Sequence, residues 1–88
     1  MEFEFEPGKS EKNRRKHGID FLIAQGLWQD ESRLIVPARS EDEPREAIIA
    51  RWGDVYWTGI YTTRNDKVRI ISVRRSRDEE KQNYDQGQ

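Results

Sequence analysis

Cysteine is absent from this chain, which excludes disulfide bonds, thiolate catalysis and cysteine-bound zinc. Apolar residues are scarce as well: 33% of the 88 residues are hydrophobic and 38% are charged, so the chain is poorer in apolar groups than a typical globular domain. No apolar run approaches the roughly 20 residues that cross a membrane, and the acidic start MEFEFE is the opposite of a signal peptide. We therefore expect a cytoplasmic protein with a small core.

Histidine is also rare, with His17 as its single example, and no spacing of histidine and acidic residues supports a metal site. Three Trp, three Tyr and three Phe, together with alternating segments from Ser32 onward, argue against disorder. A chain of this length forms one domain. We predict a single domain over 1–88, with an ordered core from about residue 3 to about residue 84.

The hydrophobic pattern predicts an α+β fold. The expected elements, in chain order, are a strand around Phe3 and Phe5, a helix at 9–17, a short helix from Asp20 to Trp28, strands at 32–38, 46–52, 55–63 and 68–75, and a helix at 77–84. Asp20 is placed to cap the second helix, whose Phe21, Ala24 and Trp28 would be buried. Four strands in hairpin succession indicate an antiparallel sheet with helices mainly on one side.

Charge is strongly segregated although the net charge is only −1. Residues 9–17 carry five cations against Glu11, and residues 64–77 carry six against Asp66. Residues 1–6 and 30–46 are both acidic. Two basic blocks in an otherwise acidic molecule favour binding of an anion such as RNA, although the overall balance is less basic than in many nucleic-acid binders.

The segment from Tyr61 to Arg77, YTTRNDKVRIISVRRSR, reads as a hairpin with its turn at Asn65 and Asp66, residues that tolerate left-handed backbone. Strand alternation predicts two faces, one with Arg69, Ile71, Val73 and Arg75, the other with Val68, Ile70, Ser72 and Arg74. The strand is apolar in its middle and cationic at its end. We expect that end to open onto an RNA phosphate.

The first helix should present Lys9, Asn13, Lys16 and His17 on one polar face. Metal-free RNA cleavage needs a base for the 2′-hydroxyl, an acid for the leaving 5′-oxygen and cations for the phosphate. His17 is the readiest proton-transfer group, and a position at a helix C-terminus favours its protonated form and hence the acid role. If His17 is too far from the arginines, Lys9, Glu43 or Tyr61 would have to serve.

Less specific interpretations compete with these assignments. A histidine before glycine at a helix end is most often a capping residue, and clustered arginines usually form a solvated face or a docking surface. Trp52, Tyr56 and Trp57 are more often core or partner contacts than platforms for bases. Other charged side chains are expected to be solvated, namely Lys12, Arg14 and Arg15 in the helix and Glu41, Asp42, Glu43 and Glu46 in or near the charged loop at 39–44.

Two blocks of the chain resemble the BrnT family of toxins from BrnT-BrnA type II toxin-antitoxin systems. The family opening F-E-W-D-P-x-K-x-x-x-N-x-x-K-H-G is matched by Phe3, Glu4, Phe5, Glu6, Pro7, Lys9, Asn13, Lys16, His17 and Gly18. An E-x-R segment at Glu43 and Arg45, an aromatic strand ending at Arg64, and the run from Val68 to Ser76 match the family centre. The resemblance covers essentially the whole chain.

The resemblance implies a RelE-like α+β fold and a metal-independent endoribonuclease without cofactor that arrests translation. It also implies neutralisation by a small BrnA-like ribbon-helix-helix antitoxin, in a hetero-oligomer that contacts DNA only through the antitoxin. We assign catalysis to Lys9, His17, Arg64 and Arg75, and RNA binding to Asn13, Lys16, Arg69, Arg74 and Arg77.

The chain departs from the family pattern at three positions, with Glu46 in place of an aromatic residue, Ala50 in place of glycine and Thr63 in place of an acid. The acid lost at Thr63 is a candidate base or an ion-pair partner for Arg64. The alternative function is therefore a weak or inactive binding module that docks the antitoxin and takes part in operon autoregulation.

Overall fold

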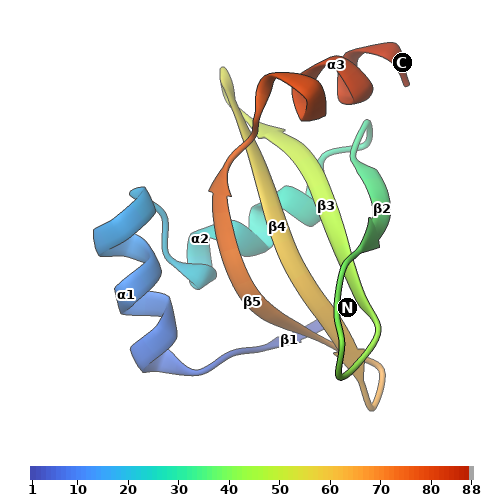
Figure 1. The fold of residues 1–88 in the computed structure, drawn as a ribbon. Helices are drawn as coiled ribbons and strands as arrows, with labels where there is room; N and C mark the ends of the chain where they lie inside the picture. Colours follow the sequence, from blue (N-terminus) through green and yellow to red (C-terminus); the bar gives the residue numbers. More distant parts are fainter. Residues whose placement is uncertain (88) are drawn as a thin grey trace.

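A computed structural model describes residues 1–87 of the protein; Gln88, the last residue of the predicted domain, lies outside the described residues. The elements, in chain order, are β1 (Glu2–Glu4), α1 (Pro7–His17), α2 (Phe21–Ala24), the 3-10 helix η1 (Gln25–Gln29), β2 (Leu34–Ala38), β3 (Arg45–Trp52), β4 (Val55–Arg64), β5 (Lys67–Arg75) and α3 (Asp78–Gln86). The strands form one sheet in the order β1-β5-β4-β3-β2 (Figure 1). The predicted α+β class is confirmed.

The sheet is mixed, so the expected all-antiparallel arrangement is wrong. β1 pairs with β5 in parallel, whereas the pairings from β2 to β5 are antiparallel. Alternation of Phe3 with glutamates identifies a strand, but the pattern contains nothing about its neighbour or its direction. Those depend on which free edge the chain reaches when it folds, and β5 provides that edge.

The predicted second helix forms only in part. Asp20 caps α2 as expected, since its Oδ1 accepts a hydrogen bond from the backbone N–H of Ile23 at 2.8 Å. The α-helix then lasts one turn and continues as η1. Gly26 in η1 lies so close to Trp52 that a Cβ at this position would stand 1.8 Å from Cζ3 of the indole. Glycine permits this approach and at the same time weakens the helix.

One face of the sheet is covered by α2 and η1, which pass behind the strands in Figure 1. The core between these layers is built from aromatic and aliphatic side chains: Phe21, Ala24, Leu27 and Trp28 from the helices, and Ile48, Ala50, Trp57, Tyr61, Val68, Ile70 and Val73 from the strands. The predicted burial of Phe21, Ala24 and Trp28 is confirmed. The helices therefore hold the back of the sheet and leave its other face for contacts.

We call that other face the open face. Residues directly opposite each other on paired strands point the same way, and on β4 and β5 the open-face pairs are Thr58 with Arg74, Ile60 with Ser72, and Thr62 with Arg69. The N-terminal part of α3 lies against one end of this face, where Glu80 contacts Thr58 and Arg74. The open face thus carries a row of arginines.

A β-bulge in β5 corrects the predicted alternation. The register shifts between Ile60 and Tyr61, which leaves Ile71 without a direct partner. Val68, Ile70 and Val73 all enter the core, so Val73 does not share a face with Arg69 as predicted. One extra residue changes the two-residue period from that point on. The turn at Asn65 and Asp66, by contrast, is confirmed by their positive φ angles of 50° and 64°.

Candidate functional site

A basic groove of about 380 Å³ runs between α1 and β5. Four of its lining residues are cationic or basic and come from α1: Lys9, Lys12, Lys16 and His17. Asn13 of the same helix and Ile71 and Ser72 of β5 complete the lining. Residues at these spacings lie on one side of a helix, so the sequence period alone gathers the basic groups.

Asn13 holds α1 against the free edge of β5. Its Nδ2 donates to the carbonyl oxygens of Ile19 at 2.8 Å and Val73 at 2.9 Å, while its Oδ1 accepts from the N–H of Val73 at 3.1 Å. The amide therefore pairs with Val73 much as a neighbouring strand would. Asn13 is buried, and we give it this structural role in place of the expected contact with RNA.

Ser10 makes a second polar contact for α1, because its Oγ accepts a hydrogen bond from the N–H of Phe21 at 2.9 Å. The sequence of α1, PGKSEKNRRKH, contains no large apolar side chain. The helix is consequently positioned by buried hydrogen bonds, which leave its other side chains in solvent. Arg14 and Arg15 are exposed and lie near Glu11, in agreement with the prediction that they are solvated.

The positive charge of the groove is not neutralised within the part of the chain that the structure describes. Within residues 1–87, no carboxylate lies within ion-pair distance of Lys12, Lys16 or His17, and Lys9 approaches Glu6 only at 4.0 Å. Unpaired cations beside a polar cleft attract anionic ligands. Lys12 was expected to face solvent only; its three-residue spacing from Lys9 was the signal that could have placed it in the groove.

A second cluster of charges lies at the β4–β5 hairpin. Glu43 contacts Arg64 at 2.9 Å and Arg45 at 3.9 Å, and Glu4 contacts Arg69 at 3.6 Å. The hydrogen bond from Arg64 lowers the pKa of Glu43. The three parts of the family centre, namely the E-x-R segment, the strand ending at Arg64 and the run from Val68 to Ser76, each contribute a residue here. Glu43 thus supplies Arg64 with the carboxylate that Thr63 cannot provide.

The two catalytic arginines that we predicted do not join the groove. Arg64 pairs with Lys67 on the open face, whereas Arg75 pairs with Trp57 at the other end of β5, on the face that carries the core. Seven residue steps along β4 separate these pairs, about 23 Å at 3.3 Å per residue. Arg75 lies 5.7 Å from the centre of the Trp57 ring. The expected single pocket of Lys9, His17, Arg64 and Arg75 is therefore wrong.

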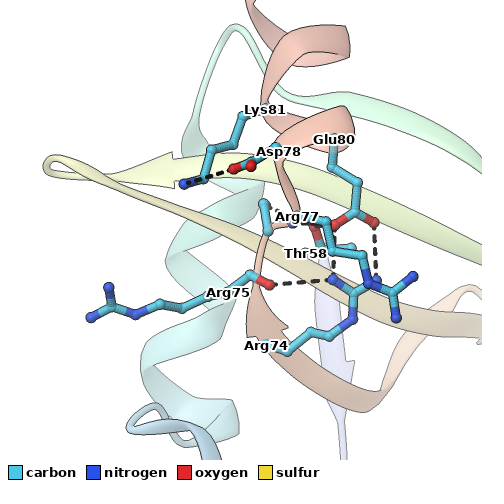
Figure 2. Close-up of polar contacts among 8 residues, drawn as sticks. Thr58, Arg74, Arg75, Arg77, Asp78, Glu80 and Lys81 are labelled. Carbon is cyan, nitrogen blue, oxygen red and sulfur yellow. Dashed lines mark hydrogen bonds and ion pairs between the residues drawn. The ribbon is translucent and has the colours of Figure 1, made fainter.

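Arg74 is held by α3. Its guanidinium donates to both oxygens of Glu80, at 2.8 and 3.0 Å, and Figure 2 shows this pair beneath the first turn of the helix. Burial of Glu80 would raise its pKa, but hydrogen bonds from Arg74, the N–H of Arg77 and Thr58 outweigh burial and lower the pKa to about 2. Glu80 is therefore ionised at neutral pH. The exposed Arg77 precedes α3 as its N-cap residue.

Two further candidates prove to be parts of the core. Tyr61 is 3% exposed, and burial raises its pKa to about 12, which makes it unsuited to proton transfer at neutral pH. Trp57 is also buried, in line with the expected packing role. Trp52 is half exposed but lies against Gly26, and the Tyr56 hydroxyl donates to Asp85 of α3 at 2.8 Å. Aromatic residues here serve mainly the fold.

Comparison with known proteins identifies the family. A family model described as the ribonuclease toxin BrnT of type II toxin-antitoxin systems matches residues 5–80. No curated protein matches the chain. No helix within residues 1–87 has the length and apolar character that crossing a membrane demands. The match spans the α1 groove, the Glu43–Arg64 ion pair of the hairpin cluster and the Arg74–Glu80 pair, and the chain belongs to the BrnT family of ribonuclease toxins of type II toxin-antitoxin systems.

Proposed function

We propose that this protein is a metal-independent endoribonuclease that binds RNA along the groove between α1 and β5. The observation that supports the proposal is the set of unneutralised basic side chains on one side of α1, Lys12, Lys16 and His17, beside the edge of β5. Phosphates of an RNA strand complement these charges. Cleavage in the cytoplasm would inhibit translation by removing messenger RNA or by acting on it at the ribosome.

His17 is the general acid in this proposal and protonates the leaving 5′-oxygen, while the proton of the attacking 2′-hydroxyl passes to water. In metal-free cleavage the 2′-oxygen attacks phosphorus, the bond from phosphorus to the 5′-oxygen breaks, and a proton moves from the attacking oxygen through a base while an acid protonates the leaving oxygen. Lys9 and Lys16 stabilise the negative charge that develops on the phosphate. The products are a 2′,3′-cyclic phosphate and a 5′-hydroxyl, which can be distinguished from the products of metal-dependent hydrolysis.

The arginines of the open face extend the RNA path in this proposal. Arg69 and Arg74 lie on the same face of β5 as Ser72, which lines the groove, and Arg64 lies on that face at the hairpin. Arg77 follows β5 at the start of α3. Arginine binds phosphate oxygens in pairs and keeps its charge at any physiological pH. We leave Arg75 out of the catalytic set because it belongs to the other face.

The decisive experiment measures cleavage of RNA by the purified protein in excess EDTA. His17→Ala should lower the cleavage rate by about 10²-fold or more, the usual contribution of a positioned acid or base. A double variant, Lys12→Ala with Lys16→Ala, should weaken RNA binding. Full activity of His17→Ala would refute its role, and cleavage that EDTA abolishes would refute metal independence.

The same helix provides a matched control. Arg14→Ala with Arg15→Ala removes the same amount of positive charge from α1, but from exposed side chains that lie near Glu11 and do not line the groove. If RNA binding depends on the groove, this control should retain most of the affinity. Equal losses in the two double variants would mean that only net charge matters.

We further propose that a small BrnA-like ribbon-helix-helix antitoxin covers this toxin and that the complex reaches DNA through the antitoxin. A relation to the RelE ribonucleases is part of the same proposal. Expression of the toxin alone should arrest growth, and co-expression with the neighbouring antitoxin gene should restore it. Loss of arrest in His17→Ala would connect the phenotype to cleavage.

A non-catalytic module that docks an antitoxin is the second candidate. It is favoured by the carboxylate partners of three open-face arginines, with Glu43 at Arg64, Glu4 at Arg69 and Glu80 at Arg74. Arginines that are held in place by carboxylate partners can form a rigid surface to which an antitoxin docks. Protein that is harmless when expressed alone and that does not cut RNA, yet binds the antitoxin, would support this function.

A further inference from the structure

The carboxylate of Glu80 occupies a site made of several donors. Arg74 donates to both of its oxygens, the Thr58 hydroxyl donates to Oε1 at 3.1 Å, and the N–H of Arg77 donates to the same oxygen at 2.8 Å. Ser76 lies 2.7 Å from the Thr58 hydroxyl and completes the polar surroundings. Figure 2 shows these groups converging from β4, β5 and the start of α3.

This donor set is chemically suited to a phosphate. A guanidinium that binds two oxygens of a carboxylate can bind two oxygens of a phosphodiester with the same fork, and a neighbouring hydroxyl can donate to either. The Arg74 side chain is 26% exposed and the Glu80 side chain 21% exposed, so the pair lies at the surface of the open face and not in the core. Removal of Glu80 would leave Arg74 accessible from solvent.

The position of Arg74 links it to the proposed RNA path. Ser72 lines the basic groove, and Arg74 follows two residues later on the same face of β5. Two residues of strand span about 7 Å. An RNA backbone that lies in the groove and continues along β5 therefore reaches Arg74 next, where it meets Glu80.

The helix that carries Glu80 is attached by few contacts. α3 has nine residues, of which Tyr84 alone is buried, and helices this short are marginal in water without tertiary contacts. Besides Glu80, the helix is held by hydrogen bonds from the Tyr84 hydroxyl to Asp30 at 2.7 Å and from the Tyr56 hydroxyl to Asp85 at 2.8 Å, and by the edge contact of the Tyr84 ring with Tyr56. Elements held by a few polar contacts open at a lower free-energy cost than the core.

We propose that Arg74 and Thr58 form an RNA-phosphate site that Glu80 occupies in the free protein. α3 moves away from the sheet as one helix when RNA binds, and a phosphate takes the place of the Glu80 carboxylate on Arg74. α3 thus limits RNA binding until this exchange occurs. The identity of the ligand rests on the proposed function; the masking of Arg74 by Glu80 is the new element.

Glu80→Gln tests the exchange directly. The probe is a fluorescein-labelled single-stranded RNA with 2′-O-methyl groups, which cannot be cleaved through its 2′-oxygens. The affinity of Glu80→Gln for this RNA should be roughly tenfold higher than that of the wild type. This is the contribution of one charge-assisted hydrogen bond from Arg74, for which the Glu80 carboxylate no longer competes with the phosphate. The slope of log K against log salt should steepen by about 0.7, as expected for one more phosphate contact on a single strand.

Glu79→Gln is the matched control, because Glu79 is the preceding carboxylate on α3, is exposed and loses the same charge. It should change the affinity far less. Glu80→Gln made together with Arg74→Ala should bind RNA no better than Arg74→Ala alone. Equal gains in Glu79→Gln and Glu80→Gln, or a gain that persists without Arg74, would overturn the proposal.

A cross-linked variant covers the case in which Glu80→Gln loses structure. The chain has no cysteine, so Tyr56→Cys with Asp85→Cys can be joined by a short bismaleimide to keep α3 on the sheet. Cross-linking should lower RNA affinity to that of Arg74→Ala, and unchanged affinity would refute the movement of α3. Polyglutamate serves as a second probe: if Glu80→Gln gains affinity for it and not for RNA, the site binds acidic protein and the proposal fails.

These outcomes are separate from those that test the proposed function. Wild-type protein that does not bind RNA through Lys12 and Lys16 contradicts the RNA path as a whole. RNA binding that depends on those lysines but does not respond to Glu80→Gln contradicts only the exchange at Arg74.

Discussion

Replacement of Asn13 by aspartate tests how α1 is held, because the two side chains have the same shape and differ in their donors. The amide donates to the carbonyls of Ile19 and Val73 and accepts from the N–H of Val73. In Asn13→Asp the acceptor remains, but both carbonyls lose their donor and face a carboxylate oxygen. The change therefore removes two buried hydrogen bonds without opening a cavity.

The expected cost follows from those two carbonyls. A buried polar group that loses its partner costs about 1–3 kcal/mol, so Asn13→Asp should lower the free energy of unfolding by about 3 kcal/mol or more. In a domain of this size that corresponds to a fall in Tm of at least about 12 °C. Urea unfolding followed by circular dichroism at pH 7 measures the free-energy difference.

Asn83→Asp provides the matched control, since Asn83 is exposed on α3 and its change should stay within about 0.5 kcal/mol. Below about pH 4, a protonated carboxyl at position 13 can donate to one carbonyl, so Asn13→Asp should regain part of the deficit. A deficit at pH 7 no larger than that of Asn83→Asp would refute the view that this amide joins α1 to β5.

Three other substitutions test packing, pH dependence and chemistry. Gly26→Ala should displace the Trp52 ring and lower the free energy of unfolding by about 1–3 kcal/mol, with a shift in tryptophan emission that Gly8→Ala does not produce. The Glu80 carboxylate has an ordinary pKa of 4.5 and a folded pKa of about 2, so the stability it confers is present above pH 4.5 and lost as the pH falls towards 2. The stability difference between wild type and Glu80→Gln in urea should therefore shrink from about pH 5 to about pH 3, and a constant difference would contradict this. Tyr61→Phe should cleave RNA at the wild-type rate, because the Tyr61 hydroxyl is buried and has a pKa of about 12; a large loss would return Tyr61 to the catalytic candidates.

Local sequence patterns determined much of the fold. The αL residues Asn65 and Asp66 form the expected turn, Asp20 caps α2, and Gly18 ends α1 with a φ of 85°. Each feature depends on the conformational preferences of a few adjacent residues, which are present in the sequence itself. The basic side of α1 is also local, because helical spacing alone brings Lys9 and Lys16 together.

Long-range features were decided by the tertiary structure. β1 pairs with the free edge of β5 in the parallel direction, and the bulge at Ile71 reverses the faces of the last residues of β5. The bulge puts Arg74, and not the predicted Arg75, on the same face as Arg69, so that Arg74 contacts Glu80 while Arg75 lies over Trp57. No run of letters distinguishes a regular strand from one with an extra residue, since both have the same apolar and β-branched composition.

The sequence by itself therefore determined the α+β class, the turns, the buried faces of α2 and the presence of two basic blocks. Only the tertiary structure decided which charges remain available to a ligand. Glu4 is far in sequence from Arg69, and Glu43 is far from Arg64, whereas Glu80 reaches Arg74 across the turn before α3. These contacts exist only once the sheet is formed. The net charge of a segment is counted along the chain, whereas the ability of a charged side chain to bind a ligand depends on its distances in space to other charged side chains.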